Sequence, residues 1–301
     1  MSKRMTRRQF LRCCLGTGAA AIAAPTCGLL YTLHVEPDWL HVRRVTVPLS
    51  RLPPQWDGFT IAQLSDLHLG PTVDIAAIRR VVNVTNTLKP DLIALTGDFV
   101  YRSASYAEPC AQALTALQAT HGVVACLGNH DHWEDAGRVE RALTEAGIRV
   151  LINAGIPLAD NSLWVAGLDD AWAGSPDLEA ALAGAPPTAS VILLAHEPDY
   201  ADTVVEHGGV HLQLSGHSHG GQVRLPFIGA LVLPYLGRRY PAGLYHLGEL
   251  TLYTNRGIGT IYPPIRLNCR PEITLLTLSA TTVGGREKGQ GRCGCSVRTG
   301  V

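Results

Sequence analysis

Short apolar runs alternate with polar loops along most of the chain, and their lengths and spacing predict alternating strands and helices. Amphipathic patterns predict three helices in the first half, over 74–88, 106–118 and 136–146. Asp74 is a plausible N-cap of the first of them, and Pro90 follows its end. Apolar runs predict strands over 42–47, 60–64, 92–95, 123–127, 163–168, 191–195, 211–214, 244–247, 250–254 and 273–278. No repeat or linker divides residues 42–279, so we expect one α/β domain of stacked mixed sheets with helices outside.

Polar side chains recur where these strands end. They are Asp66, His68, Asp98, Asn129, His130, Asp131, His196, His217 and His219. In open α/β sheets, ligands collect at the carboxyl ends of the strands. Five strand ends that supply such residues therefore predict one functional site at this edge.

The segment Leu214–Gly221, LSGHSHGG, allows two interpretations. As G-x-S-x-G it would be a nucleophile elbow with Ser218 as the attacking group. That elbow turns from a strand into a helix, but residues 220–226 make a poor helix start. The associated triad also runs in the order Ser, acid, His, and no Asp or Glu lies between His219 and His246. We therefore reject the serine-hydrolase interpretation.

As G-H-x-H, the same segment offers His217 and His219 as metal ligands. Together with carboxylates and an amide oxygen, neutral imidazoles suit manganese, iron or zinc. A carboxylate shared by two such ions would make a two-metal clamp for displacement at phosphorus.

Taken together, the motifs Asp66-x-His68, Gly97-Asp98, Gly128–Asp131, His196 and Gly216-His-x-His219 resemble the calcineurin-like metallophosphoesterase family. The resemblance covers about residues 59–278. It implies a four-layer α/β/β/α sandwich with a dinuclear metal site between the sheets.

The resemblance also implies a role for each matching residue. Asp66, His68 and His219 would hold one divalent ion, Asn129, His196 and His217 the other, and Asp98 would bridge them. A hydroxide between the ions, its pKa lowered by both cations, would be the nucleophile. His130 would face the phosphate and protonate the leaving oxygen, and Asp131 would orient His130.

The N-terminal sequence predicts where in the cell the protein is located, and the C-terminal sequence predicts a tail. Residues 6–12 carry a twin-arginine pattern, and an uncharged run follows over 13–33. We expect residues 1–33 to be a cleaved signal or an uncleaved membrane anchor, read by the twin-arginine export machinery. Together with the segment Thr254–Gly259, this start is similar to the exported or membrane-associated bacterial branch of the family. We expect residues 284–301, with Cys293 and Cys295, to be a disordered Gly- and Arg-rich tail.

The balance of acidic and basic residues bears on which partners the protein can bind. Because 25 Lys and Arg balance 25 Asp and Glu, we do not expect nucleic acid as a partner. The expected activity is that of a phosphodiesterase or pyrophosphatase at the cell envelope, on a phosphate ester of a lipid or lipid-linked sugar. The alternative is a metal-stabilised module that binds envelope phosphates without turnover.

Three further features leave alternatives open. His132 follows the catalytic loop and either shapes the substrate pocket or packs within the loop. Arg256 either holds a phosphate oxygen or forms a structural ion pair. The apolar segment 225–236 is expected to be a core strand and loop, with contact to lipid or an acyl chain as the alternative.

Overall fold

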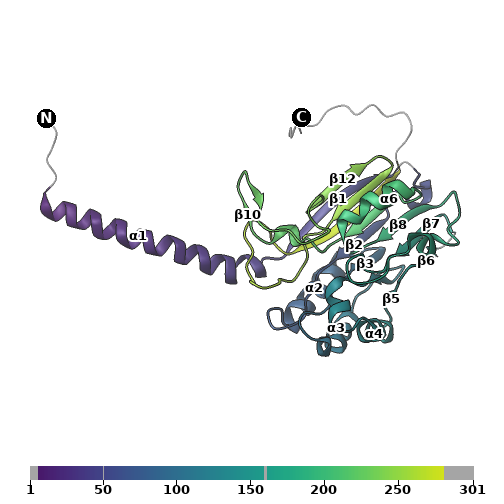
Figure 1. Ribbon diagram of the computed structural model, residues 1–301, viewed down its shortest axis with the longest axis horizontal. Helices are drawn as coiled ribbons and strands as arrows, with labels where there is room; N and C mark the ends of the chain where they lie inside the picture. Colours follow the sequence, from purple (N-terminus) through teal and green to yellow (C-terminus); the bar gives the residue numbers. More distant parts are fainter. Residues whose placement is uncertain (1–5, 50, 159–160, 281–301) are drawn as a thin grey trace.

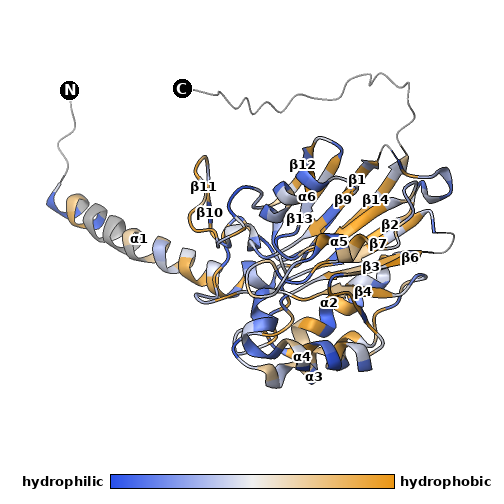
Figure 2. Cartoon of the chain, turned by 45° about the vertical axis from the view of Figure 1, so that its right-hand side comes forward, coloured by the Kyte–Doolittle hydropathy of each residue, from blue (hydrophilic) through white to orange (hydrophobic). Residues whose placement is uncertain are grey.

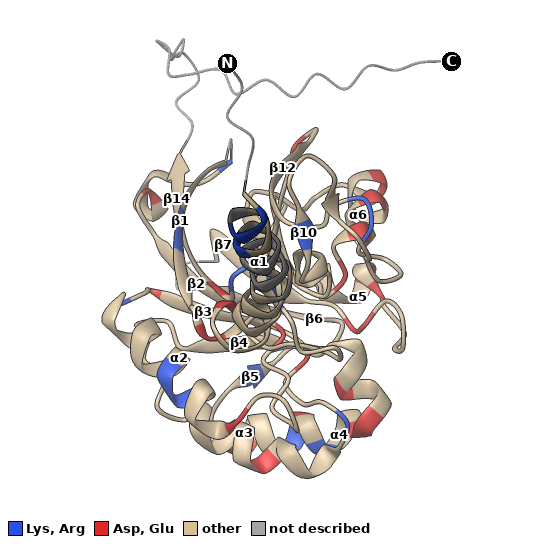
Figure 3. Ribbon diagram, turned by 90° about the vertical axis from the view of Figure 1, so that its left-hand side faces the viewer, with Lys and Arg blue, Asp and Glu red and all other residues tan. Residues whose placement is uncertain are grey.

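The computed structural model describes residues 6–49, 51–158 and 161–280, and its centre is a pair of six-stranded sheets (Figure 1). The expected tail, with Cys293 and Cys295, lies outside the described residues. A helix, α1 (Arg7–His34), precedes the domain and projects away from it (Figure 1), and Figure 3 views this helix nearly end-on. Within the described residues, no helix meets the length and apolarity needed to cross a membrane.

The first sheet combines strands from the two ends of the domain. Its order is β1 (His41–Leu49), β14 (Glu272–Ala280), β2 (Thr60–Leu64), β3 (Leu92–Thr96), β4 (Val123–Cys126) and β5 (Arg149–Val150). Strands β2 to β5 are parallel, and β14 runs antiparallel to β2. β3 is buried along its whole length, which explains its continuous apolar sequence.

The second sheet has the order β12 (Gly243–Leu247), β13 (Leu250–Thr254), β9 (Leu212–Ser215), β8 (Ser190–Leu194), β7 (Leu163–Gly167) and β6 (Ala154–Leu158). Its four central strands are parallel, and both edge strands are antiparallel to their neighbours. The apolar pattern of the sequence did not predict β5 and β6. β5 has only two residues, and Pro157 in β6 is tolerated because that strand lies at the edge.

Three apolar clusters separate four layers. One joins the facing sides of the two sheets, through residues such as Ile61, Ile192 and Leu276. A second packs α2 (Ile75–Thr87), α3 (Ala107–Leu114) and α4 (Asn129–Glu145) on the first sheet. A third joins the second sheet to α5 (Leu178–Leu182) and α6 (Ala201–His207). Figure 2 shows the apolar strands between these helical layers, so the predicted α/β/β/α sandwich is confirmed.

One helix start agrees with its prediction from the sequence, and another does not. The predicted N-cap Asp74 accepts a hydrogen bond from the N–H of Ala77 at 2.8 Å. In contrast, α4 begins at Asn129 and not near Ala136, because residues 129–131 form its first turn. There the carboxylate of Asp131 accepts the N–H of Gly128 at 3.0 Å. The backbone leaves helical geometry at Asp135, close to the predicted start.

The expectation that segment 225–236 is a core strand and loop is wrong. Its residues form a short hairpin, β10 (Arg224–Leu225) and β11 (Gly229–Ala230), which stands out from the domain (Figures 1 and 2). Phe227 is fully exposed, and Ile228 and Val232 are more than two-thirds exposed. The apolar sequence therefore covers a surface and does not fill a core.

Candidate metal centre

The loops after β2, β3, β4, β8 and β9 meet at the carboxyl ends of both sheets. They bring together seven buried side chains far apart in sequence, namely Asp66, His68, Asp98, Asn129, His196, His217 and His219. In four of them, Asp66, His68, Asp98 and His219, one potential ligand atom of each lies within 4.8 Å of the others. The chain therefore concentrates carboxylate oxygens and imidazole nitrogens at one buried point.

One half of this centre is built around two imidazoles. The Nε2 atoms of His68 and His219 lie 2.9 Å apart. Asp66 Oδ1 is 3.4 Å from His219 Nε2, and Asp98 Oδ2 is 3.4 Å from His68 Nε2. These are the four groups that the resemblance assigns to one ion.

The other half is built around His196. Its Nε2 lies 3.2 Å from Asp98 Oδ2, and its Nδ1 lies 2.6 Å from the carbonyl oxygen of Thr96. Nδ1 can donate to that carbonyl, so loss of the Nε2 proton on metal binding would leave the Nε2 lone pair facing the centre. Asp98 Oδ2 is thus within 3.5 Å of an imidazole from each half, as a bridging carboxylate requires.

Asn129 and His217 complete this half. Asn129 Oδ1 is buried and has no hydrogen-bond partner among the described residues. An unpaired buried carbonyl oxygen is costly, and a cation would satisfy it. His217 Nε2 lies 2.7 Å from the carbonyl oxygen of Tyr235, which leaves Nδ1 for another partner. The residues present therefore fit a second cation.

Backbone geometry marks the same residues. Asp66, His68, Asp98, His217 and His219 all have φ between 49° and 67°, in the left-handed region. Non-glycine residues seldom adopt this conformation, and such strain clusters at functional sites. Gly97 shows how tight the centre is, because a Cβ there would lie 2.6 Å from Nδ1 of His196. The strain is offset by the dense packing that holds each ligand in place.

Burial sets the protonation of these groups in the metal-free protein. It lowers the pKa of His68 to about 3, that of His217 to about 4, and that of His219 well below its usual value. Burial raises the pKa of Asp66 to about 7. Burial would also raise the pKa of Asp98, but His196 beside it holds that pKa well below its usual value. Three neutral imidazoles and an ionised carboxylate are ready to bind metal.

His130 and Asp131 both contact the loop that carries Asp98. The N–H of His130 donates to Asp98 Oδ1 at 2.8 Å, and its half-buried ring meets the ring of His68 edge-on at 4.9 Å. The carboxylate of Asp131 accepts the backbone N–H groups of Gly128, Asp98, Phe99 and Val100. Asp131 thus fixes the loop that carries Asp98. That Asp131 also orients the ring of His130 stays a prediction.

The two expected substrate residues each have a charged partner. His132 Nε2 lies 2.9 Å from Asp169 Oδ1, and Arg256 Nε lies 3.8 Å from Glu272 Oε2. For Arg256 this matches the structural alternative. Contact of either residue with substrate stays a prediction. Ser218 donates to the carbonyl oxygen of Pro241 at 2.5 Å and accepts from the N–H of Gly220, which makes it a turn residue.

Two supports of the site were not predicted from the sequence. The first is an arc of ring contacts that runs from Tyr101 through His130, Trp133 and Trp172 to Tyr235, of which the sequence singled out only His130 and, as a pocket or packing residue beside His132, Trp133. Trp133 and Trp172 are about half exposed, and Trp172 also meets the ring of His217. These aromatic residues come from separate loops with no shared motif, so only the fold reveals the arc.

The second support is Arg266, which is fully buried. Its guanidinium donates to the carbonyl oxygens of Arg256, Gly257, Gly259 and Cys269. Gly257 in turn packs so closely on Asp66 that a Cβ would lie 2.8 Å from the Cβ of Asp66. The segment Thr254–Gly259 thus braces the first half of the centre. Nothing in the sequence distinguishes Arg266 from a surface arginine.

Comparisons with known proteins identify the family of the chain. A family model described as calcineurin-like phosphoesterase matches residues 59–221. The chain is 38% identical to an uncharacterized metallophosphoesterase, YkuE, of Bacillus subtilis, over 93% of this chain and 99% of that protein. It is 35% identical to the phosphodiesterase YaeI of Escherichia coli, over 91% and 99%. It is 29% identical to the UDP-2,3-diacylglucosamine pyrophosphatase LpxG of Chlamydia trachomatis, over 85% and 94%. The chain therefore belongs to the calcineurin-like phosphoesterase family and is a metallophosphoesterase.

Proposed function

We propose that the protein is a dinuclear metal-dependent phosphodiesterase or pyrophosphatase. One observation carries the proposal: the Oδ2 atom of Asp98 lies 3.4 Å from His68 Nε2 and 3.2 Å from His196 Nε2, between two sets of buried ligand groups. One ion would be held by Asp66, His68 and His219. The other would be held by Asn129, His196 and His217, and Asp98 would bind both ions. Divalent manganese, iron or zinc, when bound, would supply Lewis-acid activation of water and neutralise charge on the phosphoryl group.

The protein's own residues supply positioning and a proton. His130 is the half-buried imidazole at the edge of the ligand cluster, so its ring can reach a phosphate at the centre. It stabilises charge on the phosphoryl oxygens and gives a proton to the leaving oxygen. The N–H of His130 binds the carboxylate of Asp98, and the carboxylate of Asp131 binds its backbone N–H, so the two residues hold Asp98 in its loop.

The proposed substrate is a phosphodiester or pyrophosphate of a lipid or lipid-linked sugar. Two observations support it, the exposed apolar hairpin beside the centre and the diacylglucosamine substrate in the name of the chlamydial relative. The proposed location is the periplasm or the outer face of the cytoplasmic membrane. It rests on the twin-arginine pattern at residues 6–12, which would direct the chain to the export machinery, with or without retention of the N-terminal segment as an anchor.

An assay of phosphate-ester hydrolysis, run with added metal and with a chelator as the control, tests this function. The manganese-loaded protein should hydrolyse a generic aryl phosphodiester, and chelation or Asp98→Asn should abolish hydrolysis. Ser218→Ala should retain most activity, because its hydroxyl only closes a turn. Metal binding without turnover on a panel of lipid, sugar and nucleotide esters would contradict an enzyme and favour a phosphate-binding module. Full inactivation by Ser218→Ala, with fold and metal content intact, would restore the serine nucleophile.

A further inference from the structure

An apolar cavity of about 400 Å³ opens beside the metal centre. His217, Ser218 and His219 form part of its lining. Its apolar walls are supplied by Leu231, Val232, Pro234, Ile261, Tyr262, Pro263 and Ile265. Among the described residues, no Asp, Glu, Lys or Arg side chain lines it. A group bound there would therefore touch ligand histidines on one side and hydrocarbon on the others.

One wall is built directly on the ligand loop. Gly221, with φ of +83°, packs so closely under the hairpin that a Cβ would lie 2.5 Å from the Cβ of Ala230. The N–H of Leu231 donates to the carbonyl oxygen of Val223 at 3.3 Å. Further along the same segment, the carbonyl oxygen of Tyr235 lies 2.7 Å from Nε2 of His217. The hairpin segment and the metal-ligand loop therefore form one unit.

The opposite wall is held by Gln222. Its Oε1 accepts the N–H of Ile261 at 2.8 Å, and its Nε2 donates to the carbonyl oxygens of Ile261 and Pro263. The same loop reaches α1, because the N–H of Arg266 donates to the carbonyl oxygen of Thr32 at 3.0 Å. Both walls are fixed by hydrogen bonds, so the cavity is a built feature of the fold.

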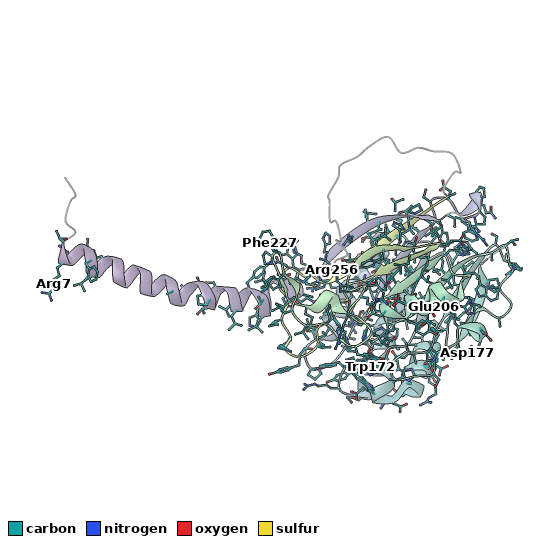
Figure 4. The ribbon with its side chains drawn as sticks, turned by 45° about the horizontal axis from the view of Figure 1, so that its top comes forward. Arg7, Trp172, Asp177, Glu206, Phe227 and Arg256 are labelled. Atoms are coloured by element: carbon teal, nitrogen blue, oxygen red, sulfur yellow. The ribbon has the colours of Figure 1, made fainter. Side chains whose placement is uncertain are left out.

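The apolar lining continues onto the outer surface. Leu231 is 54% exposed, Val232 77%, Tyr262 70% and Ile228 71%, and Phe227 at the hairpin tip is fully exposed. Figure 4 shows Phe227 at the rim of the molecule, close to where α1 meets the domain. Several large apolar side chains exposed on one segment and the loop beside it indicate a binding site for an apolar partner.

We propose that this cavity binds the hydrocarbon chain of a lipid phosphate ester, and that the hairpin tip contacts the bilayer from which the chain comes. This inference rests on the proposed function, because it places the phosphoryl group at the metal centre. Apolar walls favour hydrocarbon, which needs no hydrogen bonds, over a peptide or sugar, whose polar groups would be left unpaired. Each buried methylene should strengthen binding about fourfold.

Chain-length dependence tests the cavity. Aryl phosphodiesters with alkyl chains of increasing length should show kcat/KM that rises about 16-fold for every two methylenes that enter the cavity and then levels off. Val232→Asp should flatten this dependence, whereas Val205→Asp, the same change at an exposed valine on α6, should preserve it. A flat profile in the unchanged protein, with efficient hydrolysis of short and long esters, would overturn the inference.

A binding measurement separates this inference from the proposed function. Calorimetric titration of the metal-free protein with alkyl phosphonates should show affinity that grows with chain length, and Val232→Asp should remove that growth. Such binding without hydrolysis of any ester would refute the proposed function and leave the cavity assignment standing. Affinity independent of chain length would refute the cavity assignment.

Vesicle binding tests the source of the lipid. The full chain should cosediment with vesicles of phosphatidylcholine and phosphatidylglycerol, and the double change Phe227→Ser with Ile228→Ser should reduce the bound fraction several-fold. The same variant should hydrolyse a soluble short-chain ester as the unchanged protein does. Equal sedimentation of the two proteins would show that the tip does not contact the bilayer.

Discussion

His68 and His219, which are 151 positions apart in sequence, stack with their Nε2 atoms 2.9 Å apart. Burial holds the pKa of both imidazoles far below the usual value, so both rings are neutral. Two neutral imidazoles share at most one N–H···N hydrogen bond, whereas a cation between them would accept both lone pairs. The pair therefore indicates a metal-ligand arrangement.

Removal of one member of this pair should remove one ion. His219→Ala should lower the bound manganese from two ions to one, measured by mass-spectrometric metal analysis, and lower phosphodiester hydrolysis by about 10³-fold or more. His246→Ala is the matched control, because His246 is exposed on β12. Two ions and ordinary activity in the His219→Ala protein would contradict the ligand assignment.

His130 should act on the leaving group and not on metal binding. We expect His130→Gln to keep two ions and to lose about 10²–10⁴-fold in kcat. The loss should be larger for an alkyl ester than for a nitrophenyl ester, because a poor leaving group depends more on a proton. An equal loss for both esters would argue for charge stabilisation alone, and a loss of metal would assign His130 to the ligand set.

Asp131 should act through the loop of Asp98. Asn at this position keeps only one good acceptor for four backbone N–H groups, so Asp131→Asn should destabilise the fold by about 1–3 kcal/mol. It should also weaken metal binding about 10–100-fold. Denaturant titration and metal titration measure the two effects. Unchanged metal affinity with a lowered kcat would instead support orientation of His130 by Asp131.

Metal binding should release protons in a pH-dependent way. Although burial opposes it, the charge of Asp98 raises the pKa of His196 well above its usual value, so the metal-free protein carries that proton at neutral pH. Asp66, with a pKa of about 7, carries a second proton only below pH 7. Metal displaces both, so proton release should rise from about one at pH 8 towards two at pH 6. Affinity should accordingly fall more steeply below pH 7.

Calorimetry in buffers of different ionisation enthalpy counts the released protons. A proton release that does not change between pH 6 and pH 8 would contradict the ligand role of Asp66. The histidines with lowered pKa serve as an internal check. Because His68 and His217 are neutral above about pH 4, they should contribute no protons in this range.

Local chemistry made the layers and the ligand loops predictable. β2 and β13 begin and end at the predicted residues, because each is a short apolar run bounded by polar loops. The strand-end position of Asp66, Asp98 and His196 followed from the same pattern. The exposed hairpin at 224–230 was not predictable, because an apolar run looks the same whether it is buried or contacts an apolar partner. The support from Arg266 depends on four carbonyl groups that only the folded loop brings together.

Anomalous diffraction from crystals of the manganese-loaded protein tests the two-ion account most directly. We expect two anomalous peaks joined by the carboxylate of Asp98, one beside His68 and His219 and the other beside Asn129 and His196. A single peak, or two peaks of which one does not touch Asp98, would contradict the account.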